Sequence, residues 1–211
     1  IIRHMKYDFI IIGSGIVGLT LAFKLKKRLK QSKILILEKE KDSVQHGSGR
    51  NSGVIHSGIY YEPNSLRATL GVQGGIELKE YIKSKNLWID ECGKLLIPTS
   101  QNSYENTENL FKRGIENGVT IQKLTAREIN NLEPRVNTHY GVGLKIPFTS
   151  IADPKEVSMC LIEDLKSMGI EIKYNEVVLE VINEGIKIKT SKDTYDCTYS
   201  FNCSGLQSDD V

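Results

Sequence analysis

A glycine-rich turn between two apolar segments constrains the fold of this chain more than any other feature of its sequence. Residues 13–18 read Gly-Ser-Gly-Ile-Val-Gly, which fits the pattern G-x-G-x-x-G. The apolar run Tyr7–Ile12 precedes the turn and predicts a buried parallel strand, and a helix is predicted over Ile16–Leu29. A second buried strand, Ile34–Leu37, completes a βαβ unit. Val17, Leu21, Leu25 and Leu29 recur every four positions and indicate one face of the helix. Ala22 and Leu25 are expected on its packing side.

The turn and a nearby acidic residue together predict a dinucleotide site. Glycine lets backbone amides approach a pyrophosphate at the helix N-terminus, which is the role expected of Gly13, Gly15 and Gly18. Glu38 ends the second strand, where it can accept hydrogen bonds from ribose hydroxyls and disfavours the 2′-phosphate of NADP. The motif alone does not separate NAD from FAD, because both place an adenosine diphosphate there. The other candidate cofactor-binding residues within the turn are Ser14, Ile16 and Val17.

Charge and cysteine usage exclude several classes of function. The chain has 28 basic and 26 acidic residues, so its formal net charge of +2 favours neither nucleic acid nor an anionic membrane as a partner. Its four cysteines form no C-x-x-C pair, which argues against a zinc site or a disulfide scaffold, and no metal site is expected. The longest apolar stretch, Phe9–Phe23, is interrupted by glycines and is shorter than the roughly 20 residues of a membrane span.

The remaining pattern suggests that the chain leaves the nucleotide-binding sheet and later returns to it. We expect a first segment over residues 5–86 with a natural start at Met5, a different layer over 87–152, and a return segment over 153–211. The chain stops just after an apolar strand, so we expect a fold that is incomplete at its C-terminus. The elements expected after residue 64 are helices Ser65–Lys85, Asn102–Asn117, Thr125 to before Pro134 and Pro154–Met168, and strands Lys94–Pro98, Gly141–Pro147, Ile170–Ile172, Val177–Ile182, Ile186–Thr190 and Tyr195–Cys203, with a turn at Asn183-Glu184-Gly185.

A second signature lies between residues 46 and 61, which are rich in Gly, Ser, Asn and His. Loops of this length in a compact domain are usually functional or disordered, and interleaved apolar residues argue against disorder. Such a segment offers amides and hydroxyls to a flat polar ring, which an NAD domain does not need at this position. His46, at its start, is either a tether for flavin or an ordinary loop histidine.

With these motifs the sequence resembles the D-amino-acid-oxidase-like FAD oxidoreductases, and within them the L-2-hydroxyglutarate dehydrogenase/oxidase family. The resemblance covers the chain from about Met5, and its most specific part is residues 51–61. Gly47 and Arg50 stand where the family usually has Gln and His. The matching segments are residues 7–13, 37–40, 51–61, Pro63, Ser65-Leu66, 92–95, Glu133-Pro134, 202–206 and Ser208-Asp209.

The resemblance implies an α/β fold, in which a Rossmann-like FAD-binding domain carries an inserted α+β substrate domain. It implies FAD as the cofactor, with the pyrophosphate at the glycine turn and the adenosine ribose at Glu38. It also implies that the backbone of Val178 meets the adenine. The other residues that it places beside the cofactor are Lys39, Ser48, Asn51, Ser52, Cys203, Ser204 and Gly205.

The activity implied is hydride transfer from Cα of a small 2-hydroxy acid to flavin, with L-2-hydroxyglutarate giving 2-oxoglutarate. His56 is the candidate base and Arg50 the candidate carboxylate clamp, although His56 can also be a structural histidine. Oxygen or a quinone would reoxidise the flavin, in the cytoplasm or at the inner-membrane surface. The alternatives are a flavoenzyme acting on an amino acid, an amine or glycerol 3-phosphate, an FAD-binding fragment without catalysis, and an NAD-only dehydrogenase.

Overall fold

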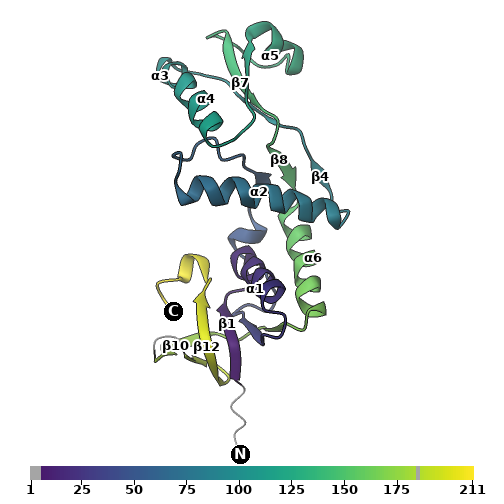
Figure 1. Cartoon of the computed structure of the whole chain (residues 1–211), viewed down its shortest axis with the longest axis vertical. Helices are drawn as coiled ribbons and strands as arrows, with labels where there is room; N and C mark the ends of the chain where they lie inside the picture. The colour runs from purple at the N-terminus through teal and green to yellow at the C-terminus, as the bar shows by residue number, and fades with distance from the viewer. Residues whose placement is uncertain (1–5, 184–185) are drawn as a thin grey trace, which may run out of the picture. The chain divides into compact units, whose positions relative to one another are not determined.

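The chain forms two compact units in the computed structural model, which describes residues 6–183 and 186–211 (Figure 1). Unit 1 contains the residues up to Asn51 together with Pro154–Val211, and unit 2 contains Ser52–Asp153. The expected start at Met5 and the Glu184-Gly185 part of the expected turn lie outside the described residues.

Unit 1 is built on a six-stranded sheet with the order β10-β11-β12-β1-β2-β9. β12, β1, β2 and β9 are parallel, whereas β10 and β11 pair antiparallel and join the sheet through β12. The parallel order confirms the predicted βαβ unit, and β1 and β12 can be followed side by side in Figure 1. The elements of unit 1 are β1 Lys6–Ile12, α1 Ile16–Arg28, β2 Ile34–Leu37, the short 3-10 helix η1 Gly47–Gly49, α6 Pro154–Ser167, β9 Glu171–Lys173, β10 Val178–Ile182, β11 Lys187–Thr190, β12 Thr194–Asn202 and the 3-10 helix η2 Gly205–Gln207.

The predicted apolar face of α1 is confirmed at Ala22 and wrong at its two ends. Val17 is 64% exposed and Leu29 is 48% exposed, while the buried residues of the helix are Gly18, Leu19 and Ala22. The helix packs through its small residues: a Cβ atom at Gly18 would overlap the carbonyl oxygen of Gly13 and meet Ile11 Cγ2 at 3.1 Å. This close approach lets α1 lie directly against the strand that precedes it, with its first turn at the carboxyl end of β1.

The core of unit 1 lies in the central strands, where all four residues of β2 are buried. Continuous apolar strands of this kind are expected when both faces of a parallel sheet are covered. The core residues packed together in unit 1 are Tyr7, Ile10, Ile12, Leu35, Leu37, Ile188, Tyr195 and Cys197.

Unit 2 contains two small antiparallel sheets with the orders β3-β8-β4 and β5-β7-β6. Helices and antiparallel strands give it the α+β character expected of the inserted layer. Asn106 separates two helices where the sequence predicts a single one. The elements of unit 2 are β3 Val54–Ile55, α2 Leu66–Ser84, β4 Ile89–Asp90, β5 Lys94–Leu96, α3 Gln101–Glu105, α4 Thr107–Glu116, β6 Gln122–Thr125, α5 Ala126–Leu132, β7 Val142–Ile146 and β8 Ser150–Ala152.

The capping box predicted at Thr125 is present. The backbone N–H of Thr125 donates to Glu128 Oε2 at 2.7 Å, and the Glu128 N–H donates to Thr125 Oγ1 at 3.4 Å. The Thr125 N–H and the Thr125 hydroxyl both donate to Glu128 Oε2, and these two bonds hold the pKa of the Glu128 carboxyl below its ordinary value.

The chain leaves unit 1 at Asn51 rather than near residue 86, and it returns at Pro154, next to the expected boundary. The first difference arises because α2 belongs to unit 2. Lys79 of that helix donates to the carbonyl oxygen of Phe148 at 3.1 Å and pairs with Glu91 at 2.7 Å. The assignment of residues 5–86, 87–152 and 153–211 to functional domains stays a prediction.

Candidate functional site

The glycine turn of unit 1 is held by two neighbouring strands. The Gly13 N–H donates to the carbonyl oxygen of Leu37 at 2.8 Å, and the Cys203 N–H donates to the carbonyl oxygen of Ile12 at 2.8 Å. Gly13 has a φ of +103°, and a Cβ atom there would lie 2.5 Å from the carbonyl oxygen of Cys203. Only glycine satisfies both constraints, so Gly13 shapes the turn where the carboxyl ends of β1, β2 and β12 meet.

Helix α1 begins at this turn without a side-chain cap from its own N-cap residue, Gly15. Instead, the Ile16 N–H donates to Ser48 Oγ at 2.9 Å. A Cβ atom built on Gly15 would meet only that same Ser48 oxygen, at 3.1 Å. The first turn of a helix presents unpaired N–H groups and a partial positive charge, so this end of α1 is suited to an anion.

Glu38 is 8% exposed and lies directly after β2. Its Oε2 accepts hydrogen bonds from the Ser14 N–H at 2.9 Å and from Ser14 Oγ at 2.6 Å, and its Oε1 accepts one from the Glu40 N–H at 3.0 Å. A carboxylate offers about four acceptor positions. The turn therefore orients Glu38 and leaves acceptor capacity for a ligand hydroxyl.

A buried network lies beside Glu38 on the strands that return to unit 1. The Glu176 N–H donates to the carbonyl oxygen of Glu38 at 2.9 Å, and the Glu176 carboxylate accepts hydrogen bonds from the hydroxyls of Thr190 and Tyr195. Burial, followed by this bond to Glu176, raises the pKa of the Tyr195 hydroxyl above its ordinary value. The network fixes the start of β10 against the end of β2.

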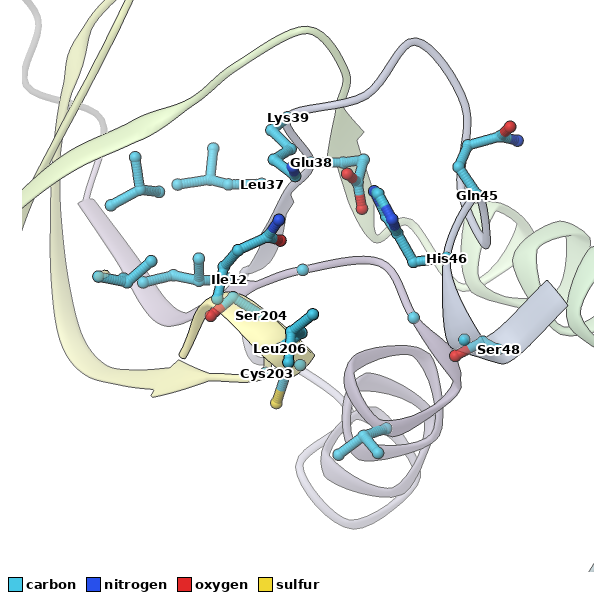
Figure 2. Close-up of a pocket in the computed structure, with 18 of the residues that line it drawn as sticks. Ile12, Leu37, Glu38, Lys39, Gln45, His46, Ser48, Cys203, Ser204 and Leu206 are labelled. Atoms are coloured by element: carbon cyan, nitrogen blue, oxygen red, sulfur yellow. The ribbon is translucent and has the colours of Figure 1, made fainter. Parts of the chain in front are cut away.

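These elements enclose a pocket of about 910 Å³. In Figure 2, Glu38 and His46 lie above the glycine turn that leads into α1, Ser48 lies beside the start of the helix, and Cys203 and Leu206 lie below the turn. Ligand pockets range from about 300 to 1,000 Å³, so this one is large enough for an extended cofactor segment.

Most residues predicted to bind the cofactor line this pocket or adjoin it. Asn51 lies beside it, where its side-chain amide donates to the carbonyl oxygens of Gly47 at 3.1 Å and Ser48 at 2.9 Å. Ser14, Ile16 and Gly18 adjoin the pocket within the turn and α1. The predicted residues that line the pocket are Gly13, Gly15, Val17, Glu38, Lys39, Ser48, Arg50, Val178, Cys203, Ser204 and Gly205.

Ser52 and His56 belong to unit 2. His56 follows β3, its side chain is exposed, and it lines a separate pocket within that unit.

Sequence reasoning missed part of the lining. Val44 and Gln45 come from the loop after β2, and Glu176 and Val177 precede β10. His46, which the sequence leaves as either a flavin tether or an ordinary loop histidine, lines the pocket, and its Nε2 lies 2.9 Å from Glu40 Oε1. This contact, with a further one from Lys39, keeps the pKa of the Glu40 carboxyl below its ordinary value. No sequence signal marks Glu176, because its burial and its partners Thr190 and Tyr195 are known only from the structure.

The arrangement fits the adenosine diphosphate part of a dinucleotide. The helix N-terminus faces the pocket through Gly15 and Val17, and Gly15 leaves space that a methyl group would occupy. Glu38, at the end of the neighbouring strand, is oriented for ribose hydroxyls. Burial raises the pKa of the Cys203 thiol, so the pocket wall on that side carries no thiolate at neutral pH.

Sequence relatives cover nearly all of the chain. It is 35% identical over 206 residues to L-2-hydroxyglutarate dehydrogenase of Escherichia coli K12, covering 96% of this chain and 48% of that protein. It is 36% identical over 221 residues to the mitochondrial L-2-hydroxyglutarate dehydrogenase of Homo sapiens, covering 98% of this chain and 47% of that protein. The chain thus spans about half the length of the curated relatives it matches.

Solved structures share the same fold. An FAD-bound L-alpha-glycerophosphate oxidase from Mycoplasma pneumoniae matches 91% of this chain and 51% of its own, with a TM-score of 0.79 and 28% identity. A glycine oxidase from Geobacillus kaustophilus matches 98% of this chain and 57% of its own, with a TM-score of 0.83. At 19% sequence identity, this match shows a similarity of fold alone.

Among the described residues, no helix is both long and apolar enough to cross a membrane. The predicted α/β fold with its FAD-binding architecture is confirmed, and FAD is confirmed as the cofactor of the family. Residues 8–211 match the family described as DAO, FAD dependent oxidoreductase, and the chain belongs to that family.

Proposed function

We propose that the complete protein oxidises L-2-hydroxyglutarate to 2-oxoglutarate with FAD as its cofactor. The observation that carries this proposal is the identity of about one third, over nearly the whole chain, to relatives that bear the name L-2-hydroxyglutarate dehydrogenase. Because the chain spans about half of their length, the activity is assigned to the protein of full length.

Unit 1 would hold the adenosine diphosphate half of FAD. The first turn of α1 would bind the pyrophosphate through backbone N–H groups, with Gly15 allowing close approach. Glu38 would accept hydrogen bonds from the ribose, held in position by Ser14. The backbone of Val178, at the pocket wall, would meet the adenine. Lys39, Ser48, Asn51, Ser52, Cys203, Ser204 and Gly205 would complete the cofactor contacts.

Unit 2 would form part of the substrate domain. Oxidation of the 2-hydroxy acid removes a hydride from Cα and a proton from the hydroxyl, and leaves a C=O bond. FAD, when bound, supplies the acceptor for the hydride. His56 would take the hydroxyl proton, since its exposed ring forms no hydrogen bond with a described residue and is open to a partner. Arg50, which lines the pocket of unit 1, would clamp a substrate carboxylate.

The electrons would leave the reduced cofactor to oxygen or to a quinone. We place the protein in the cytoplasm, with peripheral contact at the inner membrane if a quinone is the acceptor. Oxygen consumption without added dye, compared with reduction of a soluble quinone, distinguishes the two acceptors.

A substrate panel with an electron-acceptor dye tests the proposal. The purified protein is reconstituted with FAD and offered L-2-hydroxyglutarate, D-2-hydroxyglutarate, glycine, sarcosine and glycerol 3-phosphate. We expect dye reduction with the L-2-hydroxy acid above all. Turnover of glycine or sarcosine without turnover of 2-hydroxyglutarate would overturn the proposal.

A second candidate is oxidation of glycerol 3-phosphate. It is favoured by the likeness to the FAD-bound glycerophosphate oxidase, which at 28% identity goes beyond fold alone. The same panel separates the two candidates, because a phosphate ester and a dicarboxylate differ at the group that must be recognised. If bound flavin is bleached by none of these compounds, the chain is an FAD-binding fragment without catalysis.

A further inference from the structure

Unit 2 contains a small pocket, and His56 is the residue of its lining that has a role in the proposed function. The pocket has a volume of about 130 Å³, and we call it the Lys94 pocket. It lies where the two small sheets of the unit meet: His56 follows β3, Lys94 begins β5, and Thr149 lies between β7 and β8. The Gly93 N–H donates to the carbonyl oxygen of Thr149 at 2.9 Å and joins the two sides.

Two mostly buried residues in this pocket carry hydroxyls that have no hydrogen-bond partner within the described part of the chain. Ser57 and Thr149 are each 4% exposed, and both line the pocket. Neither side chain donates to or accepts from another described residue, whereas the neighbouring Ser150 hydroxyl donates to the carbonyl oxygen of Phe148 at 3.0 Å. No buried side-chain polar atom of the described residues lacks a partner, so these two unpartnered oxygens reach the open space of the pocket and are available to a group that enters it.

Lys94 supplies a fixed positive charge beside these hydroxyls. Its Nζ donates to the Tyr60 hydroxyl at 3.0 Å and lies 4.8 Å from the centre of that ring. Within residues 6–183 and 186–211 it forms no ion pair with a carboxylate. An ammonium group has three N–H donors, and the Tyr60 hydroxyl uses one of them. The remaining donors and the charge are suited to an anion.

The wall of the pocket is held by hydrogen bonds and core packing. Asn117 donates its side-chain amide to the carbonyl oxygens of Gly58 at 3.1 Å and Tyr61 at 2.9 Å, and Arg113 donates to the carbonyl oxygen of Tyr60 at 3.3 Å. Ile59, between them, is 2% exposed and belongs to the core of the unit. The loop that carries Tyr60 is therefore held before any ligand binds, which reduces the entropy lost on binding.

Glu62, the acidic residue that follows Tyr61 in the sequence, is already paired. Glu62 lies 3.1 Å from Arg113 and is not part of the lining. Positive charge and hydroxyl donors thus dominate the pocket, and the small volume selects a compact anion.

We propose that the Lys94 pocket binds one carboxylate of the organic acid substrate, with Lys94 as the charge partner and the Ser57 and Thr149 hydroxyls as donors. The identification of the ligand as a substrate carboxylate rests on the proposed function. The site itself rests on the free hydroxyls and the fixed charge, and both lie within unit 2.

The test uses the isotope-labelled 211-residue chain and glutarate, a dicarboxylate without the oxidisable hydroxyl. Nuclear magnetic resonance spectra follow the amide signals during titration. We expect the largest changes at His56, Ser57, Lys94 and Thr149 in the wild-type chain, and saturation that a matched addition of chloride does not reproduce. Absence of binding, or changes confined to other residues, would overturn the proposal.

Two variants and a matched control sharpen the result. Lys94→Met removes the charge and keeps the length of the side chain, and hydrogen bonds to charged groups predict about tenfold or greater weakening of glutarate binding. Ser57→Ala removes one donor from a folded pocket and should weaken binding by a smaller factor. Lys145→Met, on β7 and outside the lining, is the control and should bind as wild type. Equal affinity in all four chains would overturn the proposal.

Flavin reduction is measured separately, so the two proposals can fail independently. Glutarate binding at the Lys94 pocket without substrate-dependent flavin bleaching would support the anion site and refute the proposed activity. Bleaching by L-2-hydroxyglutarate with unchanged signals at the pocket would support the activity and refute the site.

Discussion

Gly15→Ala separates the folding role of the glycine turn from its role in binding. Gly15 has a φ of −74°, which any residue adopts, and an added Cβ atom meets only Ser48 Oγ, at 3.1 Å. Loss of glycine freedom in the unfolded chain stabilises by about 0.4–1 kcal/mol, which offsets the small shift of Ser48. We therefore expect a change in free energy of unfolding below about 1 kcal/mol, or less than about 4 °C in Tm for a chain of this size.

The same methyl group would occupy the space through which, in the proposed function, a pyrophosphate approaches the first turn of α1. Overpacking at a close contact costs about 1–3 kcal/mol. The Kd for FAD should therefore rise by about 5- to 150-fold. Isothermal titration of FAD into the folded apo chain measures this change, and thermal unfolding followed by circular dichroism checks the fold.

Gly13→Ala is the matched comparison in the same turn. At a φ of +103°, with 2.5 Å between the added Cβ and the carbonyl oxygen of Cys203, it combines backbone strain with overlap. The left-handed penalty of about 1–2 kcal/mol and overpacking of about 1–3 kcal/mol predict destabilisation of about 2–5 kcal/mol. If Gly15→Ala binds FAD as tightly as wild type while remaining folded, the placement of the pyrophosphate is wrong. If both variants unfold alike, the separation of the two roles is wrong.

Three further predictions concern stability and reactivity. The pKa of the Tyr195 hydroxyl is raised in the folded state, so the folded chain keeps a proton that the unfolded chain loses above about pH 10. The free energy of unfolding should therefore fall as the pH rises beyond that value. Urea unfolding at pH 8 and pH 11 should show a smaller fall in the Tyr195→Phe variant than in the wild type. Gly74 lies within α2, and an added Cβ meets no atom within 4 Å, so Gly74→Ala should raise Tm by about 1–4 °C; a lower Tm would contradict the geometry. The pKa of the Cys203 thiol is raised by burial, so at pH 7.5 this thiol should react with iodoacetamide more slowly than exposed Cys92, and bound FAD should slow its reaction further. Mass spectrometry measures both rates. If the rate at Cys203 is the same with and without FAD, Cys203 does not lie beside the cofactor.

The sequence predicted the parts of the fold that have strong local signals. The βαβ unit could be recognised because an uninterrupted apolar strand, a glycine turn and a following acid lie close together along the chain. The capping box at Thr125 could be recognised because its two hydrogen bonds join residues three positions apart. Such features depend on neighbours in sequence and need no knowledge of the tertiary structure.

The features that the sequence did not predict depend on tertiary contacts. The four-residue spacing from Val17 to Leu29 indicated an apolar helix face, yet both of these end residues are exposed. Ala22 was expected to pack, but the burial of Gly18 was not, because it depends on the close approach of α1 to β1. Strands such as β3 and β4 contain two residues each, too few to show alternation. The division of the predicted 102–117 helix at Asn106 likewise had no recognisable signal.

The candidate site shows the same distinction. The residues of the glycine turn and Glu38 could be named from their spacing, and the structure brings them to one pocket. Glu176 and Lys94 could not be assigned from spacing, because their neighbours are distant in sequence: Thr190 and Tyr195 for Glu176, and Tyr60 and Thr149 for Lys94. Whether a hydroxyl in a pocket lacks a partner is known only from the folded chain.

Titration of the apo chain with FAD, ADP and FMN tests the central claim, that unit 1 holds the adenosine diphosphate half of FAD at the glycine turn and Glu38. FMN contains the flavin and one phosphate but lacks the adenosine. We predict that FAD and ADP bind competitively, that FMN binds far more weakly, and that Glu38→Ala weakens FAD and ADP alike. Equal binding of FMN and FAD, or FAD binding that ADP does not compete with, would contradict the account.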